Sequence, residues 1–201
     1  MTKFDPKIHH RRSIRLPNYD YTQAGAYYIT IVTYNRELLF GEVVNGEMKL
    51  SNLGQIAQRE WERLPKRFKQ IELGAFVVMP DHVHGIIIIH DNRRGTADFL
   101  KHADPQIPRR APTPDVATTE RFGKPVSGSI PTIIRSYKAA VALRINYARP
   151  GDSTPVWQRN YYEHVIRNEQ DMQAKWDYIE SNPIMWDDDN ENPNKNTQEQ
   201  K

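Results

Sequence analysis

The sequence predicts an α+β domain in which helices pack on an antiparallel sheet of ferredoxin-like type. Strand-like and helix-like runs follow one another in the order strand, hairpin, helix, two strands, helix, strand, helix. Two of the strand pairs are joined by short turn signals, Asn45-Gly46 and Pro80-Asp81, which favour antiparallel neighbours. The four isoleucines at 86–89 indicate a strand that is buried on both faces and therefore central in the sheet.

The first half of the chain begins with a basic arm, residues 1–18, and continues into a single domain over 19–186. The β-branched and aromatic run at 27–34 predicts a strand, and 40–44 with 47–50 predict a hairpin around Asn45-Gly46. Apolar residues at helical spacing predict an amphipathic helix over 52–68 that stops near Pro65.

The second half begins with strands at 75–79 and 82–90 and continues with a Pro-rich, basic insertion at 91–128. Gly128-Ser129 and Pro131 open a helix that runs to about residue 147, followed by a strand at 157–166. Asn168 and Asp171 resemble a capping box that opens a last helix, 168–179, ended by Asn182-Pro183. Residues 187–201 are acidic and are expected to be disordered.

Composition excludes several kinds of site. The 201 residues include no cysteine, which rules out disulfides, thiol nucleophiles, iron–sulfur clusters and cysteine-bound zinc. Any metal must therefore be held by His, carboxylate or amide groups. The longest apolar stretch, 83–89, is too short to span a bilayer, so we expect a cytoplasmic protein without a membrane partner.

The net charge of +3 hides an uneven distribution along the chain. Residues 1–186 carry a net charge of +6, and residues 187–201 carry −3. A basic body with an acidic tail favours a polyanionic partner.

The motif Asp81-His82-Val83-His84-Gly85 lies at the start of the predicted central strand. Alternate side chains of a strand share a face, so His82 and His84 project together while Val83 points into the opposite core. Two imidazoles on one face form half of a divalent-metal site. A bare His-x-His pair also arises by chance, in which case one histidine is simply a satisfied polar residue.

Tyr178 and Asn182 are four residues apart on the last predicted helix and therefore lie one above the other. Tyr178 can be a nucleophile if its phenolate is stabilised, or a half-buried packing residue. Asn182 can offer an amide oxygen to a metal, or only end the helix before Pro183.

Basic and aromatic residues of three segments are candidate nucleic-acid contacts. The strand at 157–166 places Tyr162, His164 and Ile166 on one face, with Arg159 and Arg167 near its ends, and Glu163 is expected to be a solvated charge. The predicted phosphate contacts are Arg11, Arg12, Arg15, Lys138, Arg159 and Arg167.

Taken together, these motifs resemble those of a known family. The segment at 76–85 is similar to the His-hydrophobe-His (HUH) signature of single-tyrosine transposases, the IS200-like transposases. Arg12-Ser13-Ile14-Arg15-Leu16, the segments at 25–30 and 156–167, and Asp177-Tyr178-Ile179-Glu180-Ser181-Asn182-Pro183 are similar to its branch of REP-associated tyrosine transposases. The resemblance extends in order from about residue 11 to residue 186.

The resemblance implies an HUH endonuclease fold and a metal-dependent transposase that cleaves and rejoins single-stranded DNA at hairpins of repetitive extragenic palindromic (REP) elements. It implies that His82, His84 and Asn182 bind Mg²⁺ or Mn²⁺, and that Tyr178 forms a 5′-phosphotyrosine intermediate. It further implies a protein that acts as a monomer and is found at the bacterial nucleoid when bound to DNA.

Two other readings remain open from the sequence. One is a non-catalytic hairpin DNA-binding protein of the same fold. Such a protein would keep the basic residues but could lose any of the four candidate site residues, which are all present here: His82, His84, Tyr178 and Asn182. An RNA-binding protein of ferredoxin-like fold has less support, because no aromatic pair lies in a recognisable RNA-binding strand motif. The 91–128 insertion, which can follow single-stranded DNA or only link elements, is not explained by the family motifs.

Overall fold

The computed structural model describes residues 19–90, 126–188 and 192 of the 201-residue chain. The basic arm with Arg11, Arg12 and Arg15, most of the 91–128 insertion and most of the acidic tail lie outside the described residues. The tail starts with a short 3-10 helix, η2 (Trp186–Asp188), where disorder was expected.

Four antiparallel strands form the main sheet in the order β4-β5-β1-β6. Their bounds are β1 (Gly25–Val32), β4 (Ile71–Val78), β5 (His82–Ile89) and β6 (Tyr162–Ile166). With one helical crossover between β1 and β4 and another between β5 and β6, this is the ferredoxin-like arrangement. The predicted fold class is confirmed, and β5 is a central strand whose eight residues are all buried.

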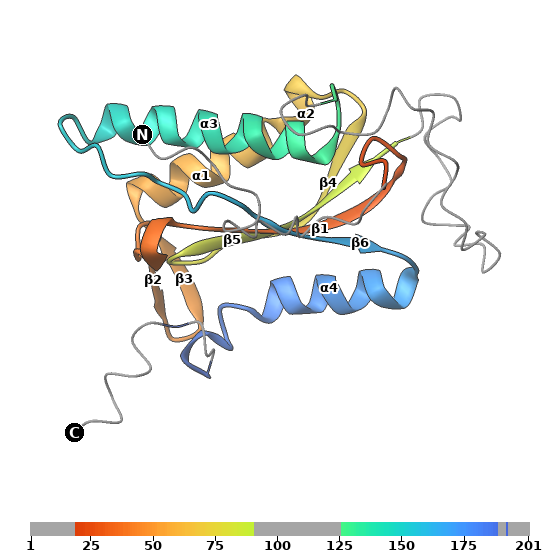
Figure 1. The fold of residues 1–201 in the computed structure, drawn as a ribbon. Helices are drawn as coiled ribbons and strands as arrows, with labels where there is room; N and C mark the ends of the chain where they lie inside the picture. The colour runs from red at the N-terminus through yellow and green to blue at the C-terminus, as the bar shows by residue number, and fades with distance from the viewer. Residues whose placement is uncertain (1–18, 91–125, 189–191, 193–201) are drawn as a thin grey trace, which may run out of the picture.

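Helices cover both faces of the sheet (Figure 1). One face carries α1 (Asn52–Glu62), α2 (Leu64–Arg67) and α3 (Ile130–Ala148), and the other carries α4 (Glu169–Ser181). Burial on both sides explains why β5 reads as a continuous apolar run. Among the described residues, no helix combines the length and the apolar character needed to cross a membrane.

The predicted hairpin forms a separate two-stranded sheet, β2 (Gly41–Val44) and β3 (Glu47–Leu50). Asn45 and Gly46 have φ values of 54° and 75°, the conformation that a two-residue hairpin turn of this type requires. This prediction is confirmed.

Three predicted boundaries shift in the structure. The helix expected over 52–68 breaks at Arg63, because Pro65 lies in the first turn of a separate short helix, α2. The strand expected at 75–79 begins four residues earlier, at Ile71. The strand expected at 157–166 is regular only from Tyr162, and Trp157 makes an isolated bridge to Thr33.

Candidate active site

The two histidines of β5 lie on the face of the sheet that α4 covers. Their ring centroids are 4.5 Å apart, and both side chains are buried. Val83, between them, packs in the core on the opposite face. The structure therefore has the alternation that the sequence predicts, with the imidazoles beneath the helix that carries Tyr178.

His84 is oriented by two hydroxyl groups of the neighbouring strand. The register pairs Thr30 of β1 directly with His84, and Tyr28 lies two residues away on the same face. The Nδ1 atom of His84 is 2.7 Å from the Tyr28 hydroxyl oxygen and 2.9 Å from Thr30 Oγ1. These contacts occupy Nδ1, and Nε2 is buried with no hydrogen-bond partner among the described residues.

His82 is oriented by the carboxylate that precedes it. Its Nδ1 atom lies at hydrogen-bonding distance from Asp81 Oδ1, and Asp81 also accepts a 3.0 Å hydrogen bond from Arg36. Arg36 has a φ of 54°, an uncommon value for a residue other than glycine, in the turn that follows β1. A carboxylate on Nδ1 favours the tautomer in which Nε2 carries a lone pair. That Nε2 atom is likewise buried and has no hydrogen-bond partner in the described part of the chain.

The end of α4 completes the site. Tyr178 is 46% exposed, and its ring centroid lies 5.3 Å from that of His84 in the same chain. Asn182, one turn later, is only 4% exposed, and its Oδ1 atom has no hydrogen-bond partner among the residues described. The Trp186 ring lies 6.0 Å from that of His82 and closes the site on that side.

The three predicted metal ligands fit a divalent cation. An orphaned buried polar atom is costly, yet His82 Nε2, His84 Nε2 and Asn182 Oδ1 are all orphaned and belong to neighbouring elements. Two imidazoles and an amide oxygen are acceptable ligands for Mn²⁺ or Mg²⁺ and leave positions for substrate oxygens. No group of three or more His, Cys, Asp or Glu side chains suited to a metal occurs within the described ranges, so an amide ligand is needed to complete this set.

Electrostatics keep His84 in the form that a metal ligand requires. Burial lowers the pKa of the His84 imidazole well below its ordinary value, and the neighbouring His82 and Lys175 lower it further. His84 is therefore neutral near pH 7, with a lone pair on the nitrogen that carries no proton.

A lysine adds positive charge to the surroundings of Tyr178, the candidate nucleophile. Lys175 lies one turn before Tyr178 on α4, and its Nζ atom is 5.1 Å from the centroid of the Tyr28 ring. The Tyr28 ring in turn lies 6.3 Å from the Tyr178 ring. Tyr28 therefore joins the histidine, the nucleophile candidate and the cation in one cluster.

The predicted DNA contacts of the described chain have different surroundings. Arg159 and Arg167 are exposed near the edge strand β6. Lys138 donates hydrogen bonds to the carbonyl oxygens of Gln158 and Asn160, at 2.5 and 2.9 Å, and so fastens this loop to α3. Glu163 differs from its expected solvated state, because both of its carboxylate oxygens are buried.

Sequence reasoning missed four residues of this cluster: Tyr28, Thr30, Asp81 and Lys175. Asp81 could have been noticed because it directly precedes the histidine pair. Tyr28 and Thr30 reach His84 only through the register of β1 against β5, which no local pattern specifies. Lys175 could have been found from its helical spacing to Tyr178.

No protein-family model matches the sequence. Two curated proteins of Haemophilus influenzae are similar to it in sequence. One, described as "Uncharacterized protein", is 40% identical over 189 residues, covering 94% of this chain and 96% of that protein. The other, described as "Putative REP-associated tyrosine transposase", is 25% identical over 165 residues, covering 82% of this chain and 73% of that protein.

Among solved structures, a REP-associated tyrosine transposase bound to a REP hairpin is 20% identical with a TM-score of 0.49, covering 92% of this chain and 73% of that chain. The chain therefore belongs to one family with the first of these Haemophilus influenzae proteins, and it is similar in sequence to the second, which is described as a putative REP-associated tyrosine transposase.

Proposed function

We propose that this protein is a metal-dependent endonuclease and strand transferase for single-stranded DNA, with Tyr178 as its nucleophile. The observation that carries the proposal is the set of three orphaned, buried atoms on His82, His84 and Asn182 beside an accessible tyrosine. A folded protein rarely leaves three such atoms without partners unless a ligand satisfies them. The relative described as REP-associated favours REP hairpins as the target.

The reaction that this arrangement supports is transesterification. The Tyr178 phenol oxygen attacks the scissile phosphorus, the bond from phosphorus to the 3′ oxygen breaks, and the phenol proton passes through solvent to that oxygen. The products are a 5′-phosphotyrosine and a free 3′-hydroxyl. Because the phosphodiester bond energy is retained, a DNA 3′-hydroxyl can reverse the step and join strands without ATP.

The residues around the nucleophile have separate tasks. A Mg²⁺ or Mn²⁺ ion held by His82, His84 and Asn182 would supply a Lewis acid and a template for the phosphate oxygens. Asp81, Tyr28 and Thr30 orient the two imidazoles. Lys175 adds positive charge where the phosphate would lie next to Tyr178.

The proposed nucleophile and His84, whose rings are in contact, belong to one chain. This supports catalysis by a monomer, as the family resemblance implies. Exposed Arg159 and Arg167 offer phosphate contacts along the β6 edge, and the N-terminal Arg11, Arg12 and Arg15 would extend them.

The test is covalent capture of DNA. The protein is incubated with Mn²⁺ and an end-labelled single strand that contains a REP hairpin, and a denaturing gel is used to detect a protein–DNA adduct. The wild type should form the adduct and Tyr178→Phe should not. Tyr162→Phe is the matched control, because Tyr162 is 52% exposed and lies near the same Tyr28 ring, at 6.4 Å.

Each outcome is informative. An adduct that persists in Tyr178→Phe but is lost in Tyr162→Phe would assign the nucleophile to β6. Hairpin binding without any adduct in the wild type would support the alternative, a non-catalytic hairpin DNA-binding protein.

A further inference from the structure

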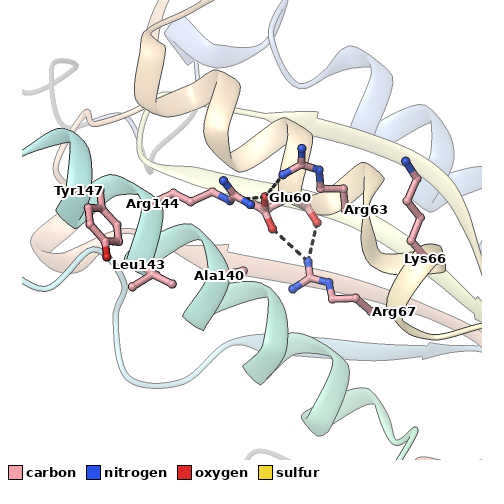
Figure 2. A pocket seen from close by; sticks show the side chains of 8 residues that line it. All are labelled: Glu60, Arg63, Lys66, Arg67, Ala140, Leu143, Arg144 and Tyr147. Carbon is pink, nitrogen blue, oxygen red and sulfur yellow. Dashed lines mark hydrogen bonds and ion pairs between the residues drawn. The ribbon is translucent and has the colours of Figure 1, made fainter.

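A second candidate site lies on the helical layer opposite α4. A hollow of about 550 Å³ opens between α1, α2 and α3 (Figure 2). Its lining contains four cationic side chains and one carboxylate: Arg63, Lys66, Arg67, Arg144 and Glu60. The excess of positive charge suits an anionic ligand.

Glu60 organises the cationic side chains around the hollow. Its side chain is only 4% exposed, and its Oε1 atom accepts from Arg63 at 2.7 Å and lies 2.6 Å from Arg144 Nε. Arg67 approaches Oε2 at 3.3 Å and also donates to the Glu60 carbonyl oxygen at 3.1 Å. Figure 2 shows the three guanidinium groups converging on this carboxylate.

Joining α1 and α2 to α3 accounts for only part of this arrangement. One arginine would neutralise Glu60, but three surround it, and Lys66 makes no ion pair among the described residues. The side chains of Arg63 and Arg144 are 47% and 54% exposed. A guanidinium has five N–H donors, so both can bind Glu60 and still present donors to a ligand.

The rim of the hollow adds an aromatic surface. Tyr147 is 81% exposed and Leu143 is 61% exposed, and they are four residues apart on α3. An exposed aromatic ring beside clustered cations is the arrangement on which single-stranded nucleic acids stack their bases while phosphates contact the cations.

We propose that this hollow is a second DNA contact that binds a single-stranded segment, with phosphates near Lys66, Arg63 and Arg144 and a base on Tyr147. The choice of DNA as the ligand rests on the proposed function. Because α4 and Tyr178 lie on the other face of the sheet, the DNA bound in this hollow is a different part of the DNA from the phosphate that Tyr178 attacks (Figure 1). A strand transferase must hold flanking or second-strand DNA as well as the cleaved site, and this surface can do so.

The experiment measures binding of a labelled oligothymidylate of about 30 nucleotides by fluorescence anisotropy. All variants are made in a Tyr178→Phe background, so that cleavage does not contribute. Lys66→Ala/Tyr147→Ala should weaken binding by about tenfold, the value of one stacked base and one phosphate contact. The dependence of log affinity on log salt should become shallower by about 0.7, for the loss of one cation.

Three controls separate this site from general effects. Tyr147→Phe keeps the ring and should bind as the parent does. Lys49→Ala removes an exposed lysine of the β2–β3 hairpin and should have little effect. Arg63, Arg67 and Arg144 are left intact because they hold the helices together through Glu60.

The inference is overturned if Lys66→Ala/Tyr147→Ala binds the oligonucleotide as tightly as the parent. It is also overturned if poly-glutamate competes equally well and Tyr147→Ala alone has no effect, because the hollow would then be a site for acidic peptides. Neither result would contradict the proposed formation of a DNA adduct at Tyr178. Conversely, failure of the adduct experiment would not change the measured oligonucleotide affinity, so the two proposals can fail independently.

Discussion

At the scale of single residues, the two imidazoles of the site are held in different ways. His84 Nδ1 meets the neutral hydroxyls of Tyr28 and Thr30, whereas His82 Nδ1 meets the Asp81 carboxylate. A carboxylate raises the basicity of its imidazole more than a hydroxyl does. His82 is therefore expected to be the stronger of the two proposed imidazole ligands.

Asp81 is accordingly expected to matter for metal affinity as a positioning residue. Asp81→Asn should weaken Mn²⁺ binding by about 10-fold to 100-fold, because the His82 ring loses its charged partner. Isothermal titration with Mn²⁺ measures this directly, without DNA.

Asp177→Asn is the matched control, because Asp177 is exposed on α4 and its carboxylate pairs with Gln173. Circular dichroism would verify that Asp81→Asn still folds. A folded variant with wild-type Mn²⁺ affinity would contradict the role of Asp81.

The site residues show where sequence reasoning succeeds. The placement of His82 and His84 on one face follows from the two-residue period of a strand, and that of Tyr178 above Asn182 follows from the helical period. Both periods relate residues that are close together in the sequence. The contact of Tyr178 with His84 is between distant segments, and only the resemblance to a family related these motifs to one another before the structure did.

At the scale of elements, the start of α4 is fastened to β6 by a short polar clasp. His164 Nε2 lies 2.8 Å from Asp171 Oδ2, and the same oxygen accepts from the Arg167 amide at 3.2 Å. Asn168 caps the helix by accepting from the Asp171 amide at 2.8 Å. Only half of the predicted capping box forms, because the Asp171 carboxylate turns to His164 and Arg167.

This clasp predicts a pH dependence of stability. Burial acts to raise the pKa of Asp171, but the hydrogen bonds from His164 and from the Arg167 amide outweigh it, and the pKa is lowered from 3.8. A carboxyl group whose pKa is lower in the folded than in the unfolded state stabilises the fold at pH values above its pKa in the unfolded state. This stabilisation is lost as the pH falls through its pKa in the folded state.

Asp171→Asn should therefore unfold more easily than the wild type near neutral pH and equally easily well below pH 3.8. Urea denaturation at several pH values measures the difference. Asp177→Asn, on the same helix, should show no such convergence. A gap between wild type and Asp171→Asn that persists at low pH would contradict the explanation.

Two of the boundaries that the sequence placed wrongly, those of β4 and α1, share one cause, a break in local periodicity. A bulge between Leu73 and Phe76 shifts the alternation of β4, so Ile71, Leu73, Phe76 and Val78 all face the α1–α3 layer. A reading based on strict alternation sees only the second part of this strand. The split of α1 from α2 at Arg63 is also a local deviation, produced by Pro65.

At the scale of the whole molecule, the sheet and the α1–α3 layer approach each other closely at Gly85. A Cβ atom at this position would lie 2.3 Å from Trp61 Cζ2, and the Trp61 ring stacks on Phe76 with centroids 4.6 Å apart. Glycine in the histidine motif therefore serves the packing of the opposite face. Sequence alone indicated this glycine only as part of the motif.

Gly85→Ala should destabilise the protein by about 1–3 kcal/mol, because the added methyl group overpacks against Trp61. Thermal denaturation checks this value. The decisive comparison is the double variant Gly85→Ala/Trp61→Leu, in which the clash is removed. The effect of Gly85→Ala should be much smaller in the Trp61→Leu background than in the wild type, and simple additivity of the two changes would contradict the packing explanation.

The arrangement of α4 has a mechanical consequence. His82 and His84 belong to the central sheet, whereas Tyr178 and Asn182 lie one turn apart at the end of one helix. Any displacement of this end of α4 would withdraw the proposed nucleophile and the proposed third metal ligand together, and with them a DNA strand joined to Tyr178. A single shift of this helix end would therefore be enough to assemble the proposed catalytic centre or to take it apart.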